Sequence, residues 1–165
     1  MDGAAMREMM VERMAWARSF TEALVGPMSD AQTVHRAGGA GNHALWVMGH
    51  LAVTDDFFLH LFSGEPRRVE RWDGMFGGGS EPKDGLGAYP SRAEVAAAFR
   101  ESHERMKAWV RGASEAELDA ALEGDMAKFA PTVRAAVVSM PAHEFFHAGQ
   151  VASCRASLGM PRLMG

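Results

Sequence analysis

Two histidines lie four residues apart near the carboxyl end of the chain, in the segment HEFFHAGQ at residues 143–150. On a helix, residues four apart share one face and are about 6 Å apart along the axis, so His143 and His147 could both bind one metal ion. Gln150 and Cys154 continue the same stripe at steps of three and four. The spacing therefore predicts either half of a metal site or a hydrated helix face.

The residues upstream on this stripe favour the metal site, because they are apolar: Val133, Ala136 or Val137, and Met140. Both histidines should therefore face the core, where each ring must satisfy a donor and an acceptor. Binding a metal through one nitrogen and a polar protein group through the other meets that requirement. His50 is the predicted third ligand, because it lies on the other strongly apolar stripe, which is expected to face inward: Trp46, Val53, Phe57 and Leu61. Taken alone, a single inward histidine such as His50 is more often a hydrogen-bonded core residue than a metal ligand.

Three neighbouring residues of the same helix have other predicted roles. Glu144 could be a general base, an alternative ligand to His143 or an exposed helix residue, and we favour contact with the site or a role as base. Gln150 is predicted to orient a ligand, with an ordinary polar contact as the alternative. Cys154 lies about two turns beyond His147, too far to share its ion, and is expected to be a buried thiol.

The remaining histidines lack such neighbours and are predicted to be surface or helix-cap residues: His35, His43, His60 and His103.

Three histidines with an open position are typical of catalytic zinc, nickel or iron sites, whereas structural zinc sites usually have four ligands that include thiolates. Histidine ligands do not distinguish zinc from nickel. The string H-E-x-x-H also occurs in zinc proteases. The extended protease motif needs a glycine and a histidine where this chain has Gln150 and Ser153, so that interpretation is disfavoured.

Apolar periodicity predicts four long helices that could position these residues. The first covers 4–25, the second runs from a cap at Asn42 to about 62, and the third opens with a capping box at Ser91 and Glu94. A short helix should follow over 114–122. The last long helix runs from about 132 to 159, with a kink or restart at Pro141. No segment alternates like a strand, so we predict an all-α four-helix bundle forming a single domain over 1–165.

The connection between the second and third long helices, residues 63–90, holds seven of the 18 glycines. Long connections of this kind are usually functional or disordered. It also contains large apolar residues, and we therefore expect an ordered loop packed over the bundle: Trp72, Met75, Phe76 and Tyr89. Gly49, in the middle of the second helix, indicates close approach of another segment.

The composition excludes several classes of function. A net charge of -4 and a pI near 6.0 argue against binding to nucleic acid, and the short run Arg67, Arg68 and Arg71 is predicted to be a solvated loop face. No apolar run is long enough for a membrane span. The single cysteine cannot form an internal disulfide, which favours a cytoplasmic protein.

Four segments, in order, resemble the DinB-like family, also called DinB/YfiT-like: NHALWVMGHLA at 42–52, RWDGMFGGGSEP at 71–82, YPSRAEV at 89–95 and HEFFHAGQVASCRASLG at 143–159. The resemblance spans nearly the whole chain. It implies a four-helix bundle in which His50, His143 and His147 hold a divalent metal. Some relatives use a glutamate of the last helix as a ligand, which keeps Glu144 a candidate.

Proteins with this architecture include bacillithiol S-transferases and a mycothiol-dependent maleylpyruvate isomerase. The resemblance therefore implies a low-molecular-weight-thiol S-transferase, in which the metal lowers the pKa of a bound thiol that attacks a small electrophile beneath the 63–90 loop. Glu144 or a metal-bound water would handle the proton. The alternatives are a metal-dependent hydrolase and a non-catalytic metal-binding or stress-related module, with a homodimer as a further expectation.

Overall fold

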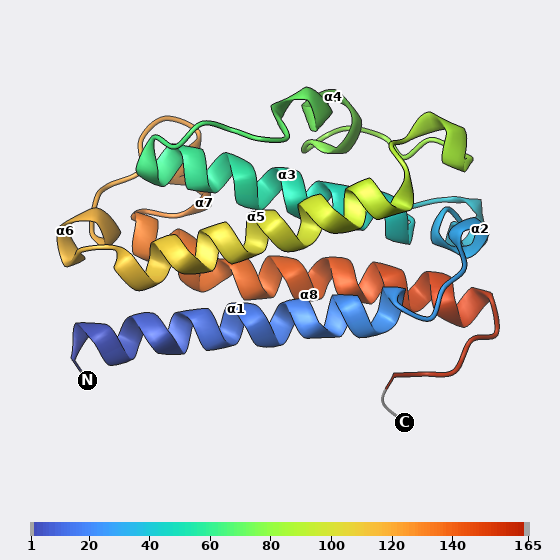
Figure 1. Cartoon of the computed structure of the whole chain (residues 1–165), viewed down its shortest axis with the longest axis horizontal. Helices are drawn as coiled ribbons and strands as arrows, with labels where there is room; N and C mark the ends of the chain where they lie inside the picture. Colours follow the sequence, from blue (N-terminus) through green and yellow to red (C-terminus); the bar gives the residue numbers. More distant parts are fainter. Residues whose placement is uncertain (1, 164–165) are drawn as a thin grey trace.

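The computed structural model describes residues 2–163, and within this part the chain is helical and contains no strand. Four long helices form the bundle: α1 (Gly3–Val25), α3 (Ala44–Ser63), α5 (Arg92–Gly112) and α8 (Val133–Ser157) (Figure 1). The short helices lie in the connections: α2 (Asp30–Thr33), η1 (Ala37–Gly39), η2 (Glu70–Trp72), α4 (Asp73–Phe76), η3 (Leu86–Ala88), α6 (Glu115–Leu118) and α7 (Met126–Phe129). The predicted all-α four-helix bundle is confirmed. That it forms one domain over 1–165 stays a prediction, and residues 1 and 164–165 lie outside the described part.

The direction of the helices explains the long connection. The helices α1 and α8 pack against each other and run in one direction, whereas α3 and α5 pack together and run in the opposite direction (Figure 1). Two consecutive helices that run in parallel need a connection that returns along the whole bundle. Residues 64–91 provide it, crossing the outside of α3 from its end to the start of α5.

Helix boundaries follow local capping chemistry. The capping boxes of Ser91 with Glu94 and of Ser114 with Glu117 are both present, and Thr132 caps α8. The prediction that Asn42 caps the second long helix is wrong by one residue. His43 is the cap, because its Nδ1 accepts a hydrogen bond from the backbone N–H of Trp46 at 3.0 Å, while the Asn42 amide is used elsewhere.

Two other predicted boundaries differ. The helix expected over 114–122 ends at Leu118, where the chain leaves the helix and Ala121 pairs with Thr132 in an isolated bridge. Of the kink or restart predicted at Pro141, the restart is wrong, since α8 is one helix from Val133 to Ser157.

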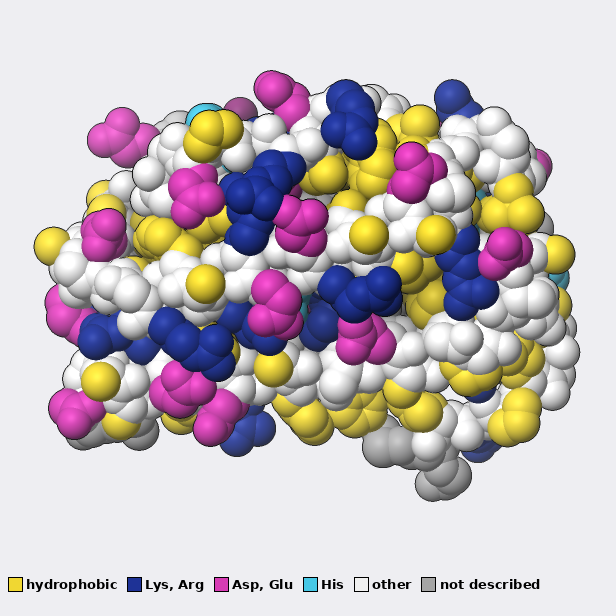
Figure 2. Space-filling model, in the orientation of Figure 1, with side chains coloured by type: hydrophobic (Ala, Val, Ile, Leu, Met, Phe, Trp, Pro, Cys, Tyr) yellow, Lys and Arg dark blue, Asp and Glu magenta, His cyan; other side chains and the backbone are white. Residues whose placement is uncertain are grey.

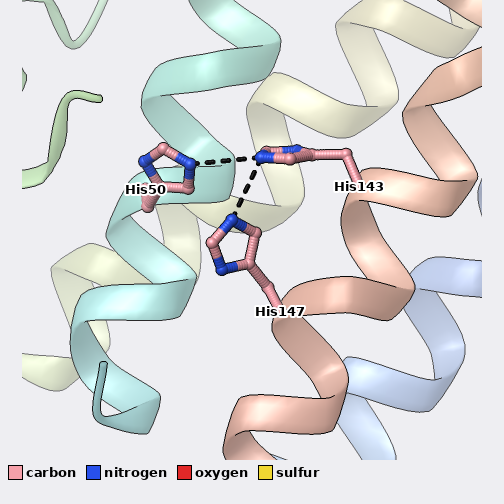
Figure 3. Close-up of side chains that lie close together, drawn as sticks. All are labelled: His50, His143 and His147. Carbon is pink, nitrogen blue, oxygen red and sulfur yellow. Dashed lines mark hydrogen bonds between the residues drawn. The ribbon is translucent and has the colours of Figure 1, made fainter. Parts of the chain in front are cut away.

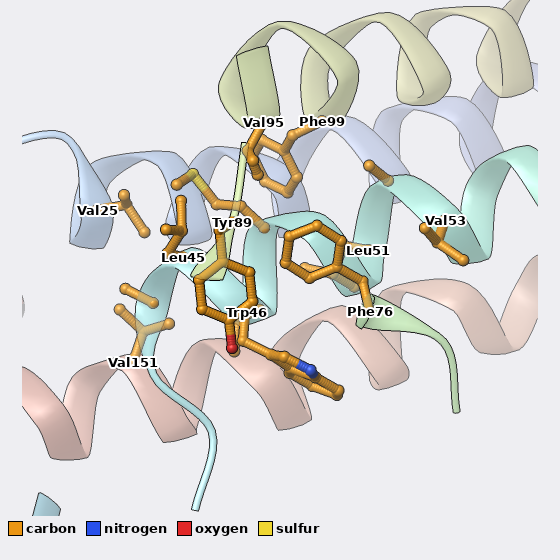
Figure 4. Packing of buried hydrophobic residues seen from close by; sticks show 14 of the residues in the cluster. Val25, Leu45, Trp46, Leu51, Val53, Phe76, Tyr89, Val95, Phe99 and Val151 are labelled. Atoms are coloured by element: carbon orange, nitrogen blue, oxygen red, sulfur yellow. The ribbon is translucent and has the colours of Figure 1, made fainter. Parts of the chain in front are cut away.

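The connection over 64–91 is ordered, as predicted. Trp72, Phe76 and Tyr89 are buried, and the rings of Phe76 and Tyr89 stack at 5.3 Å within the core (Figure 4). Asp56 on α3 anchors the start of the connection by accepting the backbone N–H groups of Arg68 and Val69, at 3.0 and 3.1 Å.

Gly49 is the point of closest approach between α3 and this connection. A Cβ atom at that position would lie 2.4 Å from the ring of Phe76, so any side chain would displace it. The predicted close approach is confirmed, and it lies one residue from His50.

Two predicted surfaces need correction. On α3, Trp46 and Val53 are buried, but Phe57 and Leu61 are 36% and 41% exposed, because the stripe turns away from the core near the end of the helix. Arg67 is not part of a solvated face, since it forms ion pairs with Asp73 and Asp56; Arg68 and Arg71 are exposed. On the face of the molecule drawn in Figure 2, basic and acidic side chains are interspersed.

Within residues 2–163, no helix is long and apolar enough to cross a membrane.

Candidate metal centre

Three imidazole rings converge between α3 and α8 (Figure 3). His50 comes from α3, and His143 and His147 come from successive turns of α8. The Nε2 atom of His143 lies 3.3 Å from that of His50 and 3.0 Å from that of His147. Nitrogens bound at about 2.0–2.1 Å to one ion, with angles of about 90–110°, are about 2.8–3.4 Å apart. The spacing therefore fits three ligands of a single ion.

The other ring nitrogens of His50 and His147 are held by the protein. His50 Nδ1 donates to the backbone carbonyl of Phe76 at 2.7 Å, and His147 Nδ1 donates to Gln150 Oε1 at 2.9 Å. Gln150 Oε1 also accepts a hydrogen bond from Asn42 Nδ2 at 3.0 Å, which fixes the amide. With the proton on Nδ1, both rings point an Nε2 lone pair at the centre of the cluster.

The electrostatic surroundings keep the cluster uncharged. Burial lowers the pKa of His143 to about 4, with a further contribution from the charge of His50. Burial also lowers the pKa of His147 to about 4, against the opposing effect of its hydrogen bond to Gln150, and it lowers the pKa of His50. Three neutral rings thus bring their Nε2 atoms together. A single N–H at Nε2 of His143 could not satisfy the Nε2 lone pairs of both His50 and His147, which face it. A divalent cation is the group that suits this donor set.

Glu144 faces away from the histidines, towards α1. Its carboxylate accepts hydrogen bonds from Arg18 Nε at 3.0 and 3.1 Å and from Thr21 Oγ1 at 2.7 Å. The side chain is buried, so the alternative of an exposed helix residue is wrong. The group of potential ligands found within residues 2–163 consists of the three histidines and does not include Glu144.

A cavity of about 470 Å³ adjoins the cluster. His50 and His143 are among the residues that line it, and residues of α3, α7 and α8 form most of the remaining wall. Its volume is in the range of pockets that bind small molecules. A small molecule could therefore reach two of the three histidines from this side.

Residues 13–151 match the family model of the DinB superfamily. The chain belongs to this superfamily. A solved structure with the same fold is YfiT from Bacillus subtilis, described as a probable metal-dependent hydrolase with an unusual four-helix bundle topology. This DinB-superfamily chain aligns with YfiT at a TM-score of 0.67 and 15% identity, over 94% of this chain and 89% of YfiT. At that identity the likeness establishes the fold alone. A comparison with curated proteins gave no significant match.

The sequence prediction for His103 is wrong. This residue of α5 is neither at the surface nor a cap: it is 4% exposed, and its Nδ1 lies 3.1 Å from Asp55 Oδ2. The signal was its position four residues after Phe99, on the buried face of the helix. Of the other histidines, His43 is a cap, His60 is exposed and His35 is half-buried.

A buried network of charges beside the cluster was also missed. Arg18 of α1 pairs with Asp55 and Glu144, in each case at 3.0 Å, and also donates to the backbone carbonyl of Phe99. Cys154, in contrast, is a buried thiol as expected, with its Sγ 3.6 Å from the Asn42 carbonyl.

Proposed function

We propose that His50, His143 and His147 bind one divalent metal ion, zinc or nickel, and that the protein is a metal-dependent enzyme acting on a small molecule. The observation that carries this proposal is the convergence of three Nε2 atoms, 3.0–3.3 Å apart along the cluster, next to a cavity that reaches two of the rings. A bound metal would supply Lewis acidity, lowering the pKa of a thiol or of water at the site.

The protein's own residues prepare this site before anything binds. Phe76 and Gln150 set the direction of two imidazoles through their hydrogen bonds to the Nδ1 atoms. The indole of Trp46 stacks on the His50 ring at 4.7 Å with an interplanar angle of 8°, which restricts rotation of that ring. Rings fixed in this way lose little freedom on binding, which favours affinity.

The reaction we favour is transfer of a low-molecular-weight thiol to an electrophile. The surroundings of Glu144 support this choice. Both of its oxygens accept hydrogen bonds from Arg18, so Glu144 could act as a base only by disrupting a buried ion pair. A thiol has an ordinary pKa of about 8.5 and needs less help to lose its proton than water does.

Metal-dependent hydrolysis is the second candidate, and the fold shared with YfiT favours it, since YfiT is described as a probable hydrolase. A non-catalytic metal-binding or stress-related module is the third. A cytoplasmic location, a small-molecule partner and a homodimer also belong to the proposal. The oligomeric state can be measured by analytical ultracentrifugation.

One experiment separates the candidates. Purified protein is loaded with zinc or nickel and assayed for thiol conjugation to a panel of electrophiles, and in parallel for hydrolysis of esters and amides without thiol. Turnover that requires thiol and is lost in His50→Ala supports the transferase. Turnover without thiol that His50→Ala abolishes replaces it with the hydrolase. Metal binding without turnover in either assay leaves the non-catalytic module.

A further inference from the structure

The cavity beside the metal centre extends along α3 towards α7. His50 and Phe58 are the first and last residues of α3 that line it, and eight residues of helix span about 12 Å. The ring of Phe129 on α7 lies 5.4 Å from the ring of Phe58, so α7 lies at the end of the cavity remote from His50. A small molecule in the cavity could therefore contact the metal centre at one end and α7 at the other.

The wall of the cavity is mainly apolar. Phe57 and Phe129 belong to this wall, yet they are 36% and 44% exposed. Exposed aromatic rings that face a cavity favour a ligand that covers them with apolar surface. The apolar side chains contributed by α3, α7 and α8 include Leu51, Phe57, Phe58, Met126, Phe129 and Met140.

The charged side chains that line the cavity are already paired with one another or with their neighbours. Arg67 forms two hydrogen bonds to Asp73, at 2.5 and 2.6 Å. Asp55 and Glu144 both pair with the guanidinium of Arg18. A charge on the body of a ligand would gain a protein partner only by breaking one of these pairs, which is costly in a buried place. Away from the metal centre, the cavity therefore favours an uncharged ligand.

We propose that this cavity binds the substrate and that Phe129 is a specificity-determining residue. The substrate class is a molecule with an uncharged, apolar body, such as an aromatic ring that carries a short alkyl chain. Its reacting group lies at His50 and His143, and its apolar end lies against Phe58 and Phe129. This inference rests on the proposed function for the reaction at the metal centre, but the binding of an unreactive probe does not require that reaction.

The test compares three unreactive probes: 4-butylbenzyl alcohol, 4-butylbenzoate, which is charged at the same end, and benzyl alcohol, which lacks the butyl chain. Their affinities are measured at neutral pH by isothermal titration calorimetry, on purified protein from which a chelator has removed any metal. We expect 4-butylbenzyl alcohol to bind at least about tenfold more tightly than benzyl alcohol, since each buried methylene group contributes about fourfold. It should also bind at least about tenfold more tightly than 4-butylbenzoate, because the carboxylate would be buried without a partner.

The same titrations on metal-loaded protein test whether the cavity reaches the metal centre. With metal present, 4-butylbenzoate should bind at least about tenfold more tightly than without it, since a carboxylate can bind at the open position of the ion. The affinity of 4-butylbenzyl alcohol should change much less. The metal content of each sample is measured as well. Protein that takes up no metal counts against the proposed function, whereas the metal-free titrations decide about the pocket independently.

The matched variants address the end of the cavity at α7. Since the side chain of Phe129 is partly exposed, Phe129→Ala should fold, and it should weaken the binding of 4-butylbenzyl alcohol about fivefold, as loss of about 40 Å² of apolar contact provides. Leu61→Ala is the control, because Leu61 lies on α3, is 41% exposed and is outside the cavity lining, and this variant should bind like the wild type. Met126→Ala, at the other lining residue of α7, replaces Phe129→Ala if that variant does not fold.

Three results would overturn the proposal. The first is that 4-butylbenzyl alcohol does not bind to the wild-type protein or has no advantage over the other two probes in metal-free protein. The second is that bound metal leaves the affinity for 4-butylbenzoate unchanged. The third is that Phe129→Ala and Met126→Ala bind 4-butylbenzyl alcohol as tightly as Leu61→Ala does.

Discussion

At the scale of single residues, the central feature is that three histidines are held neutral and pointed at one another. The protein meets the cost of burying them by using two of the Nδ1 atoms as donors to Phe76 and Gln150. Rings arranged in this way bind protons weakly and bind a metal ion well.

This arrangement predicts how metal affinity depends on pH. A lowered pKa means that His143 and His147 stay deprotonated as the pH falls, until it approaches about 4. Three histidines with an ordinary pKa of about 6.5 would lose about 50-fold in affinity between about pH 7.5 and about pH 6.0. We expect a loss of less than about fivefold over that interval, because the folded site holds no competing protons. Competition titration with a chromophoric chelator at both pH values measures it, and a 50-fold loss would show that the rings have ordinary pKa values.

Arg18 is the second residue whose role can be tested. Removing its charge in Arg18→Met would leave Asp55 and Glu144 as two buried carboxylates without a cation. Such a change typically costs about 3–5 kcal/mol of folding free energy. The exposed pair of Arg111 with Glu8 provides the control, because Arg111→Met should change stability little. Urea unfolding of both variants checks this, and similar midpoints would contradict the assigned importance of the buried network.

At the scale of elements, the connection between α3 and α5 joins the two helices and also forms part of the metal site. It provides the carbonyl of Phe76 for His50, and Asp56 fixes its path by binding two of its backbone N–H groups. Gly49 allows the connection to lie against α3, since a Cβ atom there would collide with Phe76.

Gly49→Ala should therefore weaken the metal site without changing a ligand. The added methyl group pushes Phe76 outwards, costs about 1–3 kcal/mol of stability and lengthens the hydrogen bond that holds His50. Gly149→Ala on α8 is the matched control, because its Cβ would meet no atom within 4 Å and alanine favours a helix. Thermal unfolding and metal titration of both variants measure the difference. If Gly49→Ala binds metal as tightly as Gly149→Ala does, the connection does not orient His50.

At the scale of the whole molecule, local patterns and non-local contacts differ in how far they can be predicted from sequence. The long helices follow from apolar periodicity and from caps such as Ser91 with Glu94, which act over a few residues. The grouping of His143 with His147 follows from helix geometry, and His50 joins them because its own stripe is apolar.

The ion pair of Arg18 with Glu144 joins residues 126 apart in sequence, and nothing local marks either residue as buried. His103 differs in that its position four residues after Phe99 is a local sign of burial, but its partner, Asp55, lies on a different helix, 48 residues away. The cap is His43 instead of Asn42 for a related reason, since the Asn42 side chain donates a hydrogen bond to Gln150 on α8. Contacts between helices thus decide the features that the sequence alone did not reveal.

The measurement that tests the central claim most directly is the metal content of tag-free protein by elemental mass spectrometry. Wild type is compared with His50→Ala, with the double variant His143→Ala/His147→Ala, and with the exposed control His60→Ala. We predict about one equivalent of zinc or nickel in the wild type and in the control, and loss of the metal in the other two variants. A wild-type protein without metal even after reconstitution, or ligand variants that retain it, would contradict the account.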